Sequence, residues 1–237
     1  MARGRWLATP LAVVPTGCIM QMFTRRDLTS LFRSLADRMA AEQDHLAELD
    51  GEIGDADHGV AMSGGFAAAA RALGETEDNG QSLGRGLQLA ALAFLNEVGA
   101  TTGPLYASAL QRAAMVFDED DQIPANRLPE LVAAMSNGIE SRGHGRLGDK
   151  TMVDAWVPAA HAARAGLNAG HDLAATLRAA ADAAAEGAEA TRAMMASKGR
   201  AARLGRRSVG HLDPGAVSAA ALLDALASWA AARFGAS

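Results

Sequence analysis

Apolar residues recur every three to four positions through most of this 237-residue chain, a period that is typical of amphipathic helices rather than strands. Alanine supplies much of the 49% hydrophobic content, whereas aromatic residues make up only 4%. Small and unbranched side chains lose little freedom in a helix, so composition and period both favour an all-α fold. We predict helices over residues 25–48, 58–73, 82–98, 103–117, 127–142, 149–166, 171–195 and 213–234.

The connections between these eight predicted helices are of two kinds. Those that follow the second, fourth and sixth helices are ordinary polar turns. Those that follow the first, third, fifth and seventh mix glycine with acidic, hydroxyl or basic residues, and read DGEIGDADHG, GATTGP, RGHGRLGDK and SKGRAARLGRRSVGHLDPG. Because successive helices of an up-and-down bundle alternate in direction, these four connections meet at one end. We therefore predict an eight-helix antiparallel up-and-down barrel or bundle with its site at that end.

The starts of four predicted helices open onto the same end. Thr102 and Asp213 are N-cap residues near a proline of the first turn, and Asp57 and Asp149 are candidate caps of the second and sixth helices. Helix N-termini present unpaired N–H groups and the positive end of the helix dipole. Each cap alone is what any bundle needs, but four at one end favour a phosphate site.

Three aspartates, Asp50, Asp55 and Asp57, stand close together in a glycine-rich connection. Carboxylates that are brought together repel one another unless a cation neutralises them, and Mg²⁺ prefers such oxygen ligands. A solvated acidic turn with an aspartate cap is the alternative at this stage. The spacing does not match a helix-loop-helix calcium loop, and the six histidines and the single Cys18 form no zinc pattern.

The last of the four connections is basic, although the chain as a whole carries a net charge of -5. That charge argues against general nucleic-acid binding and for a local anion site or an acidic partner. No phosphate-binding loop of the Gly-Lys-Ser/Thr type and no dinucleotide glycine fingerprint is present. Arg200 is the strongest candidate because it lies near glycines; the others are Lys198, Arg203, Arg206 and Arg207.

Residues 1–22 imitate a signal peptide only weakly, because Pro10 and Pro15 interrupt the apolar run. We expect a disordered extension, or a start codon placed too far upstream, before a single domain at 23–237. No other uncharged apolar run approaches the ~20 residues of a membrane span. We expect a soluble, cytoplasmic protein that does not bind membranes. By residue type alone, Met152 and Trp156 are core residues.

Four motifs together identify a family: IGDADHG, TTGPLY, GDKTMVDAWVPA and ASKGRAARLGRRSVGHLDPGAVS. Over about residues 23–235 the chain resembles the L subunit, the nucleotide-binding subunit, of dihydroxyacetone kinase. The acidic motif separates it from the related nucleotide domains of fatty-acid kinases, which read more like D-G-D-T-G. The resemblance implies an eight-helix barrel that binds ADP or ATP through two Mg²⁺ ions at one end.

The resemblance also implies roles for individual residues. Asp50, Asp55 and Asp57 would bind the metal, and Arg200 would stabilise the transferring phosphoryl group. Two departures concern Ala61, where family members often have Asn, and residues 100–103, where they often read Gly-x-Ser-Gly. The implied nucleotide contacts are His58, Gly59, Val60, Ala61, Thr101, Thr102, Gly143, Met152, Arg200, Asp213, Pro214 and Gly215.

The function implied is phosphoryl transfer to dihydroxyacetone that a separate K subunit holds. A stand-alone chain of this length favours bound ADP that a phosphoenolpyruvate:sugar phosphotransferase protein rephosphorylates. Two alternatives stay open: an ATP-dependent kinase subunit for another short ketose or aldose, and an interaction protein whose nucleotide state a transcriptional regulator reads. A homodimer is a further assembly that the sequence leaves open. A purely structural scaffold would leave the four connections unexplained.

Overall fold

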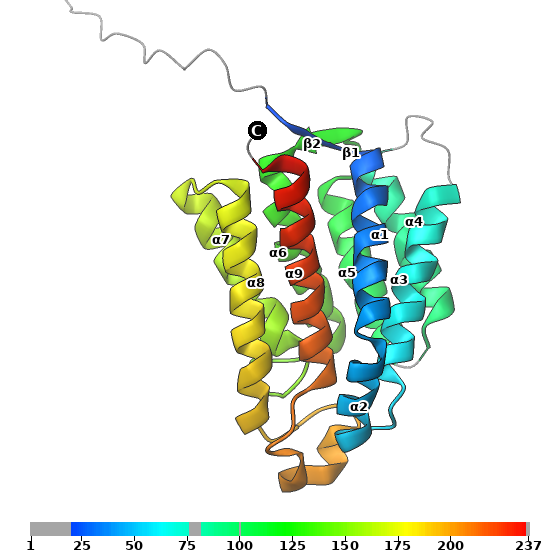
Figure 1. Ribbon diagram of the computed structural model, residues 1–237, viewed down its shortest axis with the longest axis vertical. Helices are drawn as coiled ribbons and strands as arrows, with labels where there is room; N and C mark the ends of the chain where they lie inside the picture. The colour runs from blue at the N-terminus through cyan, green and yellow to red at the C-terminus, as the bar shows by residue number, and fades with distance from the viewer. Residues whose placement is uncertain (1–19, 76–81, 100, 236–237) are drawn as a thin grey trace, which may run out of the picture.

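A computed structural model describes residues 20–75, 82–99 and 101–235, and these form an elongated ring of nearly antiparallel helices (Figure 1). A short two-stranded sheet lies at one end, and the longest connection lies at the other. The elements are β1 (Met22–Thr24), α1 (Arg25–Ala41), α2 (Gln43–Ile53), α3 (His58–Glu75), α4 (Leu83–Glu97), α5 (Thr102–Val116), β2 (Gln122–Pro124), η1 (Ala125–Arg127), α6 (Leu128–Gly143), α7 (Val153–Ala169), α8 (Leu173–Ala190), η2 (Thr191–Ala193), η3 (Ala201–Ser208) and α9 (Pro214–Phe234).

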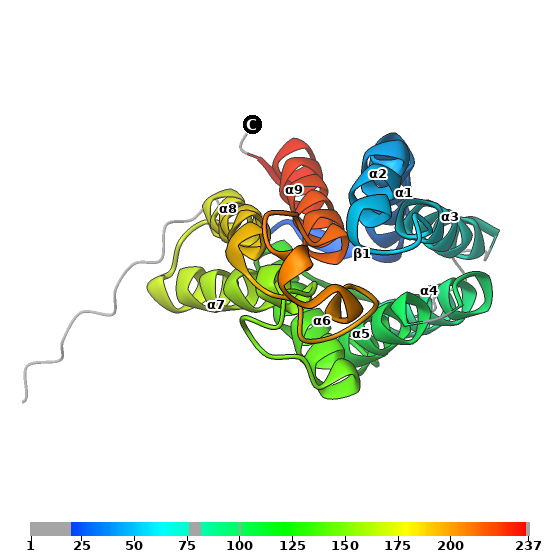
Figure 2. The same ribbon diagram turned by 90° about the horizontal axis from the view of Figure 1, so that it is seen from below.

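The helices close into a barrel. From α3 onward each long helix packs against the next, α1 packs against α3, and α9 returns to pack against α1 (Figure 2). Because α2 continues α1 at one place in the ring, the nine long helices of the described residues occupy eight positions. The prediction of an all-α, eight-helix antiparallel barrel is confirmed.

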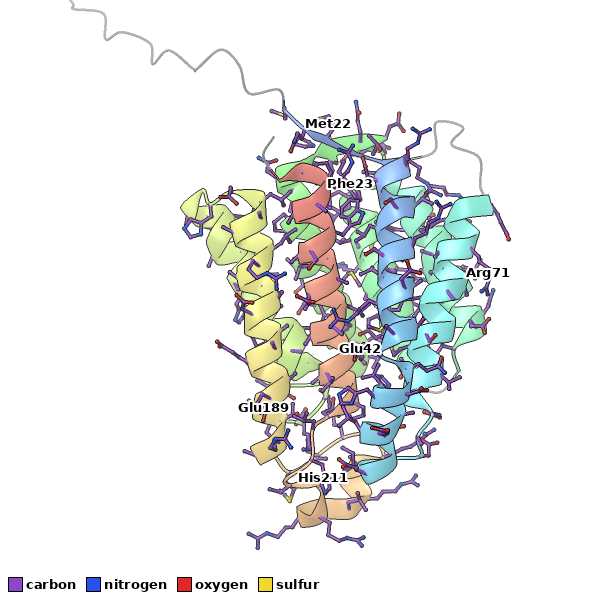
Figure 3. The ribbon with its side chains drawn as sticks, viewed as in Figure 1. Met22, Phe23, Glu42, Arg71, Glu189 and His211 are labelled. Carbon is purple, nitrogen blue, oxygen red and sulfur yellow. The ribbon has the colours of Figure 1, made fainter. Side chains whose placement is uncertain are left out.

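The first predicted helix is wrong in one respect, because residues 25–48 do not form one unbroken helix. The backbone departs from helical geometry at Glu42, with φ -89° and ψ -3°, and α2 then runs on to Ile53 (Figure 3). Arg38 holds the Glu42 carboxylate at 2.9 Å and also bonds Asp224 of α9 at 2.8 Å. The break lets α2 pack closely on the start of α3. The spacing of apolar residues along residues 25–48 cannot predict this contact, because it depends on another segment of the chain.

The sheet at the far end was not predicted. Strands β1 and β2 pair antiparallel, with Phe23 opposite Ile123 and Met22 opposite Pro124. Phe23 is buried and meets Trp229 of α9 edge to face, with ring centroids 5.9 Å apart. The expectation of a disordered extension concerns residues that, up to position 19, lie outside the described part of the chain.

Aromatic side chains fill the middle of the barrel, and the prediction that Trp156 belongs to the core is confirmed. Phe66 packs on Phe94 and Tyr106 at centroid distances of 5.3 and 5.7 Å, and Tyr106 packs on Trp156. Helix α9 is long and apolar enough to cross a membrane, but 56% of its most apolar 18-residue stretch is buried inside the barrel. A core helix passes the same test, so α9 does not indicate a membrane protein.

Candidate nucleotide and metal site

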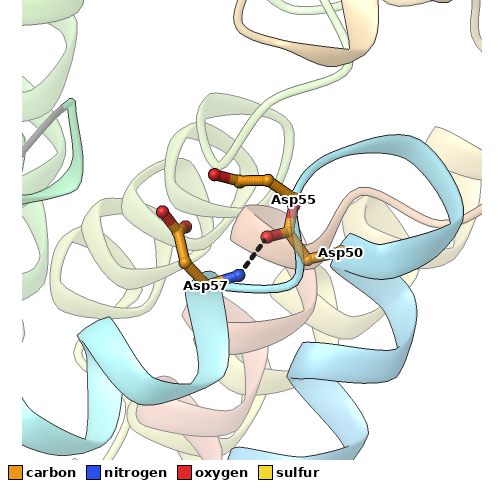
Figure 4. Close-up of side chains that lie close together, drawn as sticks. All are labelled: Asp50, Asp55 and Asp57. Atoms are coloured by element: carbon orange, nitrogen blue, oxygen red, sulfur yellow. Dashed lines mark hydrogen bonds between the residues drawn. The ribbon is translucent and has the colours of Figure 1, made fainter.

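The three predicted aspartates converge where α2 meets α3. One carboxylate oxygen from each of Asp50, Asp55 and Asp57 lies within 4.8 Å of the other two (Figure 4). Asp50 is buried in the last turn of α2, whereas Asp55 and Asp57 are exposed in the connection to α3. The predicted convergence is confirmed, and binding of a metal there stays a prediction.

Asp50 has a second task, which is to cap α3. Its Oδ2 accepts hydrogen bonds from the backbone N–H groups of Asp57 at 2.9 Å and His58 at 3.2 Å. We had predicted Asp57 as this cap; the structure instead satisfies the first-turn donors with a carboxylate from another helix. The Asp57 side chain is thereby left to face Asp55.

The carboxylates of the cluster affect one another, and Arg200 offsets part of their charge. Partial burial, followed by the charge of Asp50, raises the pKa of Asp57 above its ordinary value. Arg200, from the connection between α8 and α9, pairs with Asp55 and places its Nη1 3.0 Å from Asp57 Oδ2. Of the five basic candidates in that connection, Arg200 is the one paired with these carboxylates within the described residues.

Beside the aspartates lies an open pocket of about 440 Å³. It is walled by all four glycine-bearing connections and by the first turns of α3, α5, α7 and α9, which confirms that the four connections meet. The lining residues are Asp50, Ile53, Asp57, His58, Thr101, Thr102, Leu105, Ile139, Gly143, Gly145, Lys150, Thr151, Met152, Val153, Lys198, Gly199, Arg200, Ala201, Asp213, Pro214 and Gly215.

Most residues that the resemblance assigned to the nucleotide lie in this wall, but three do not. Gly59, Val60 and Ala61 are outside the lining. Val60 is 60% exposed, and Gly59 is buried against α2, where an added Cβ would overlap the carbonyl oxygen of Gln43. Asp55 is also outside the lining, although its carboxylate lies beside those of Asp50 and Asp57. Gly59 thus has a packing role that sequence reasoning did not foresee.

Of the remaining predicted caps, Asp213 is confirmed, whereas Thr102 and Asp149 are wrong. Asp213 caps α9, and its Oδ2 accepts from the Ala216 N–H at 2.7 Å. Thr102 is not a cap, because α5 begins at Thr102 itself and Thr101 makes no side-chain cap bond. A helix start shifted by one residue leaves both threonines in the pocket wall.

The predicted cap of the sixth helix is also wrong. Helix α7 begins at Val153, four residues later than expected. The buried Asp154 of its first turn accepts from the N–H groups of Gly148 at 2.5 Å and Thr151 at 2.9 Å. Asp149 instead accepts from the Ser197 hydroxyl at 2.6 Å, so it joins two of the connections.

His58 lines the pocket but is held in the barrel wall. Its Nε2 lies 2.9 Å from Ser218 Oγ of α9. Burial lowers the pKa of His58 to about 4, against the opposing effects of the Asp50 carboxylate and a hydrogen bond to the Pro214 carbonyl. At neutral pH the ring is therefore uncharged, and its role is to join α3 to α9 rather than to supply positive charge.

This neutral histidine predicts a pH-dependent stability. Above pH ~6.5 both the folded and unfolded states hold His58 neutral; between about 6.5 and 4 only the unfolded state gains a proton, so stability falls as the pH falls. The stability advantage of the wild type over His58→Gln should shrink by about 2 kcal/mol from pH 7 to pH 5. Urea unfolding in EDTA at both pH values measures it.

The comparison with His58→Gln also removes a competing contribution. Desolvation raises the pKa of Asp213 to about 7, which on its own would make the fold more stable as the pH falls. Both proteins contain Asp213, so its contribution cancels in the difference. A stability difference that stays constant between pH 7 and pH 5 would contradict the buried neutral state of His58.

Several pocket residues were missed at the level of sequence. Lys150 and Thr151 stand inside the GDKTM motif, where a lysine two residues after a glycine and shortly before a helix is a signal of a possible anion site. The apolar lining residues look like ordinary core positions until the chain is folded. The missed residues are Ile53, Leu105, Ile139, Gly145, Lys150, Thr151, Val153, Gly199 and Ala201.

Comparison with models of known protein families assigns the chain to one of them. The profile of the DAK2 domain matches residues 52–228. The chain belongs to the DAK2 domain family. The match contains all four glycine-bearing connections except the first residues of the acidic one, so the pocket lies almost wholly within the DAK2 domain.

Curated relatives of this DAK2 domain are subunits and domains of sugar kinases. It is 34% identical over 204 residues to the PEP-dependent dihydroxyacetone kinase, ADP-binding subunit DhaL, of Escherichia coli (strain K12), covering 86% of this chain and 96% of that one. It is 36% identical over 190 residues to the PTS-dependent subunit DhaL of Lactococcus lactis, covering 80% and 90%. It is also 36% identical to the L-erythrulose 1-kinase of Mycolicibacterium smegmatis, covering 85% of this chain but 35% of that enzyme.

A solved structure supports the fold. The dihydroxyacetone kinase from C. freundii, crystallised in complex with AMP-PNP and Mg²⁺, superposes with a TM-score of 0.63 at 22% identity. The superposition covers 96% of this chain and 38% of the crystallised chain, so the DAK2 domain spans well under half of that enzyme. At this level of identity the likeness establishes the barrel alone.

Proposed function

We propose that this chain is the ADP- or ATP-binding subunit of a dihydroxyacetone (glycerone) kinase, a phosphotransferase. It would transfer a phosphoryl group from bound nucleotide to dihydroxyacetone, or a similar short sugar, on a separate K subunit. The observation that carries the proposal is a pocket lined by Asp50, Asp57 and the first turns of four helices, with the carboxylate of Asp55 clustered beside the other two. Carboxylates suit Mg²⁺, and helix N-termini suit the phosphates that Mg²⁺ bridges.

The pocket lining combines polar and apolar residues. Aspartates, threonines and glycines line it together with Ile53, Leu105 and Ile139, which supply apolar surface. A mostly apolar lining with a few convergent polar groups is typical of small-molecule sites, and the volume lies in their usual range of roughly 300–1,000 Å³. We infer that the phosphates lie toward the aspartates and that the base contacts the apolar residues.

In this arrangement the protein contributes positioning and charge. Mg²⁺, for which we propose two ions, would neutralise the phosphate oxygens when bound at Asp50, Asp55 and Asp57. Arg200 is held at the same carboxylates, so its guanidinium is close to any phosphate that they bind through a metal. A fixed cation at that place stabilises the charge that develops as the phosphoryl group leaves.

The proposal also specifies the phosphoryl donor. Relatives that the chain covers almost completely are named PEP-dependent and PTS-dependent ADP-binding subunits. We infer that ADP stays bound to this chain in the cytoplasm and is rephosphorylated by a phosphocarrier protein of the phosphotransferase system. The likeness to an erythrulose kinase keeps an ATP-dependent reaction on another short ketose or aldose as the alternative.

One reconstitution decides donor and acceptor together. The purified chain is mixed with a K subunit and dihydroxyacetone, and receives either ATP or a phosphorylated phosphocarrier protein. Dihydroxyacetone phosphate is expected with the phosphocarrier and not with ATP alone. Product formed only with ATP would move the chain to the ATP-dependent class. If neither donor gave a phosphorylated product, from dihydroxyacetone or from erythrulose in its place, the kinase assignment would be contradicted.

A second candidate function is an interaction whose strength depends on the nucleotide state, with a transcriptional regulator as the partner. Arg203, Arg206 and Arg207 are exposed on η3 at the tip of the site end, where they form a basic surface on an acidic protein. Arg206→Glu with Arg207→Glu should abolish capture of such a regulator and leave ADP affinity within about twofold, since surface changes away from a site have small effects. Capture that survives the double reversal dismisses this function.

A further inference from the structure

Lys150 is placed where a lysine is costly. Its side chain is only 1% exposed, and its backbone has a φ of 60°, in the left-handed region that residues with a Cβ rarely adopt. The chain has just two lysines, and the other, Lys198, is partly exposed. A buried charge in a strained backbone persists only where its surroundings satisfy it, so the contacts of Lys150 indicate its use.

Those contacts are two backbone carbonyls. Lys150 Nζ donates to the carbonyl oxygen of Thr191 at 2.6 Å and to that of His211. Thr191 is the C-cap residue of α8, and His211 lies two residues before Asp213, the N-cap residue of α9. The ammonium group thus joins the two ends of the intervening segment, residues 192–210, which carries Arg200.

Other bonds at the same place complete the closure. Thr191 Oγ1 accepts from the N–H of Asp213 at 3.0 Å, and the N–H of Gly210 donates to the Arg192 carbonyl at 2.8 Å. Inside the segment, Ser208 Oγ accepts from the N–H of Ala196 at 2.9 Å. The segment is therefore a closed loop with its base at Lys150, and it lies across the open end of the barrel (Figure 2).

Burial lowers the pKa of Lys150, and so does the charge of Arg192, whereas the charges of Asp213 and Asp154 oppose this shift and favour the ammonium form. The carbonyl of Thr191 belongs to the C-terminal end of a helix, where the negative end of the dipole favours a cation. A side chain without a donor would leave the buried carbonyl of Thr191 and the partly buried carbonyl of His211 without this hydrogen bond.

We propose that Lys150 is a positioning residue that clamps the base of segment 192–210 and so holds Arg200 against Asp55 and Asp57. By holding the segment over the pocket, the clamp also slows the release of bound nucleotide. The clamp itself is independent of what the pocket binds; its effect on release rests on the proposed function.

Hydrogen exchange on the nucleotide-free protein tests the clamp directly. Lys150→Met removes the ammonium and keeps an unbranched side chain that is one atom shorter. The amides of Ala196, Gly210 and Asp213 are expected to exchange about 10- to 100-fold faster, the factor that loss of hydrogen bonds to a charged group implies. Amides in α4 and α5 should exchange at the wild-type rate. Arg203→Met, an exposed change on the same segment, is the matched control and should leave all of these rates unchanged.

A second measurement connects the clamp to the site. The dissociation rate of a fluorescent ADP analogue in the presence of Mg²⁺ should rise about tenfold in Lys150→Met, with little change in the association rate, because a looser segment lets the nucleotide leave. Should the wild-type chain bind no nucleotide, the proposed function fails and hydrogen exchange alone decides the clamp.

Lys150→Gln is a second variant in case Lys150→Met does not fold, because glutamine keeps an uncharged hydrogen-bond donor at this position. Its exchange rates at Ala196 and Gly210 should lie between those of the wild type and Lys150→Met. Wild-type rates in both variants would overturn the clamp. Faster exchange throughout α4 and α5 as well as in the segment would also overturn it, because Lys150 would then stabilise the whole barrel rather than position this segment.

Discussion

Replacement of Asp55 by asparagine is expected to weaken Mg²⁺-dependent binding of ADP by at least about 100-fold. Loss of an outer-shell partner of a metal ligand typically costs 10- to 100-fold in metal affinity, and Asp55 is proposed as a ligand itself. Asparagine keeps the shape of the side chain and removes the charge. Calorimetric titration of ADP with Mg²⁺, and then with EDTA in its place, measures the effect.

Asp55 is a cleaner probe than its neighbours because it holds no part of the fold. Asp50 caps α3 through two backbone N–H groups, so its replacement would disturb the barrel as well as the metal site. Asp55 is exposed, and its side-chain partner is Arg200, whose own side chain is 46% exposed. Unfolding free energy should therefore change by no more than about 0.5 kcal/mol in Asp55→Asn.

The matched control is Asp44→Asn, which removes the same charge from the first turn of α2, the helix that precedes Asp55. Asp44 is exposed and lies outside the pocket lining, so ADP affinity should stay at the wild-type value. Equal ADP affinity in Asp55→Asn and Asp44→Asn would show that the aspartate cluster is a solvated acidic turn. The metal assignment would then be wrong even though the pocket remained.

Gly59→Ala is expected to destabilise the protein by about 1–3 kcal/mol, the usual cost of overpacking. An added Cβ at Gly59 would overlap the Gln43 carbonyl oxygen and lie 3.0 Å from the Ala47 nitrogen, both of which are backbone atoms of α2 that have no rotamer to change. Helix α2 would have to move away from α3. Since α2 carries Asp50, the substitution should weaken ADP binding as well as lower the melting temperature.

Gly64→Ala is the control on the same helix. A Cβ there would meet only the Glu97 side chain at 3.5 Å, an ordinary contact. Alanine favours helix over glycine by roughly 0.5–1 kcal/mol, so Gly64→Ala should be slightly stabilising. Thermal unfolding of the two variants separates packing from helix propensity. A Gly59→Ala protein that is as stable as Gly64→Ala but binds ADP poorly would instead favour the phosphate contact that the family resemblance implied.

The parts of the fold that follow from short stretches of chain could be predicted. The helix expected at 82–98 is observed at Leu83–Glu97, and that at 213–234 is observed at Pro214–Phe234, because periodicity and caps act within a few residues. Alternation of helix direction was enough to bring the four glycine-bearing connections to one end. The clustering of Asp50, Asp55 and Asp57 followed because they are close in the chain.

The remaining features arise between segments that are far apart in the chain. The break at Glu42 depends on the packing of α2 against α3, and the cap of α3 comes from the preceding helix instead of the residue before it. Lys150 is 41 residues from one of its carbonyl partners and 61 from the other. A pattern along one segment reports which face is apolar and where a helix can begin. Which distant group satisfies a buried donor or carbonyl is decided only when the barrel closes, because these bonds form at distances that no local propensity encodes.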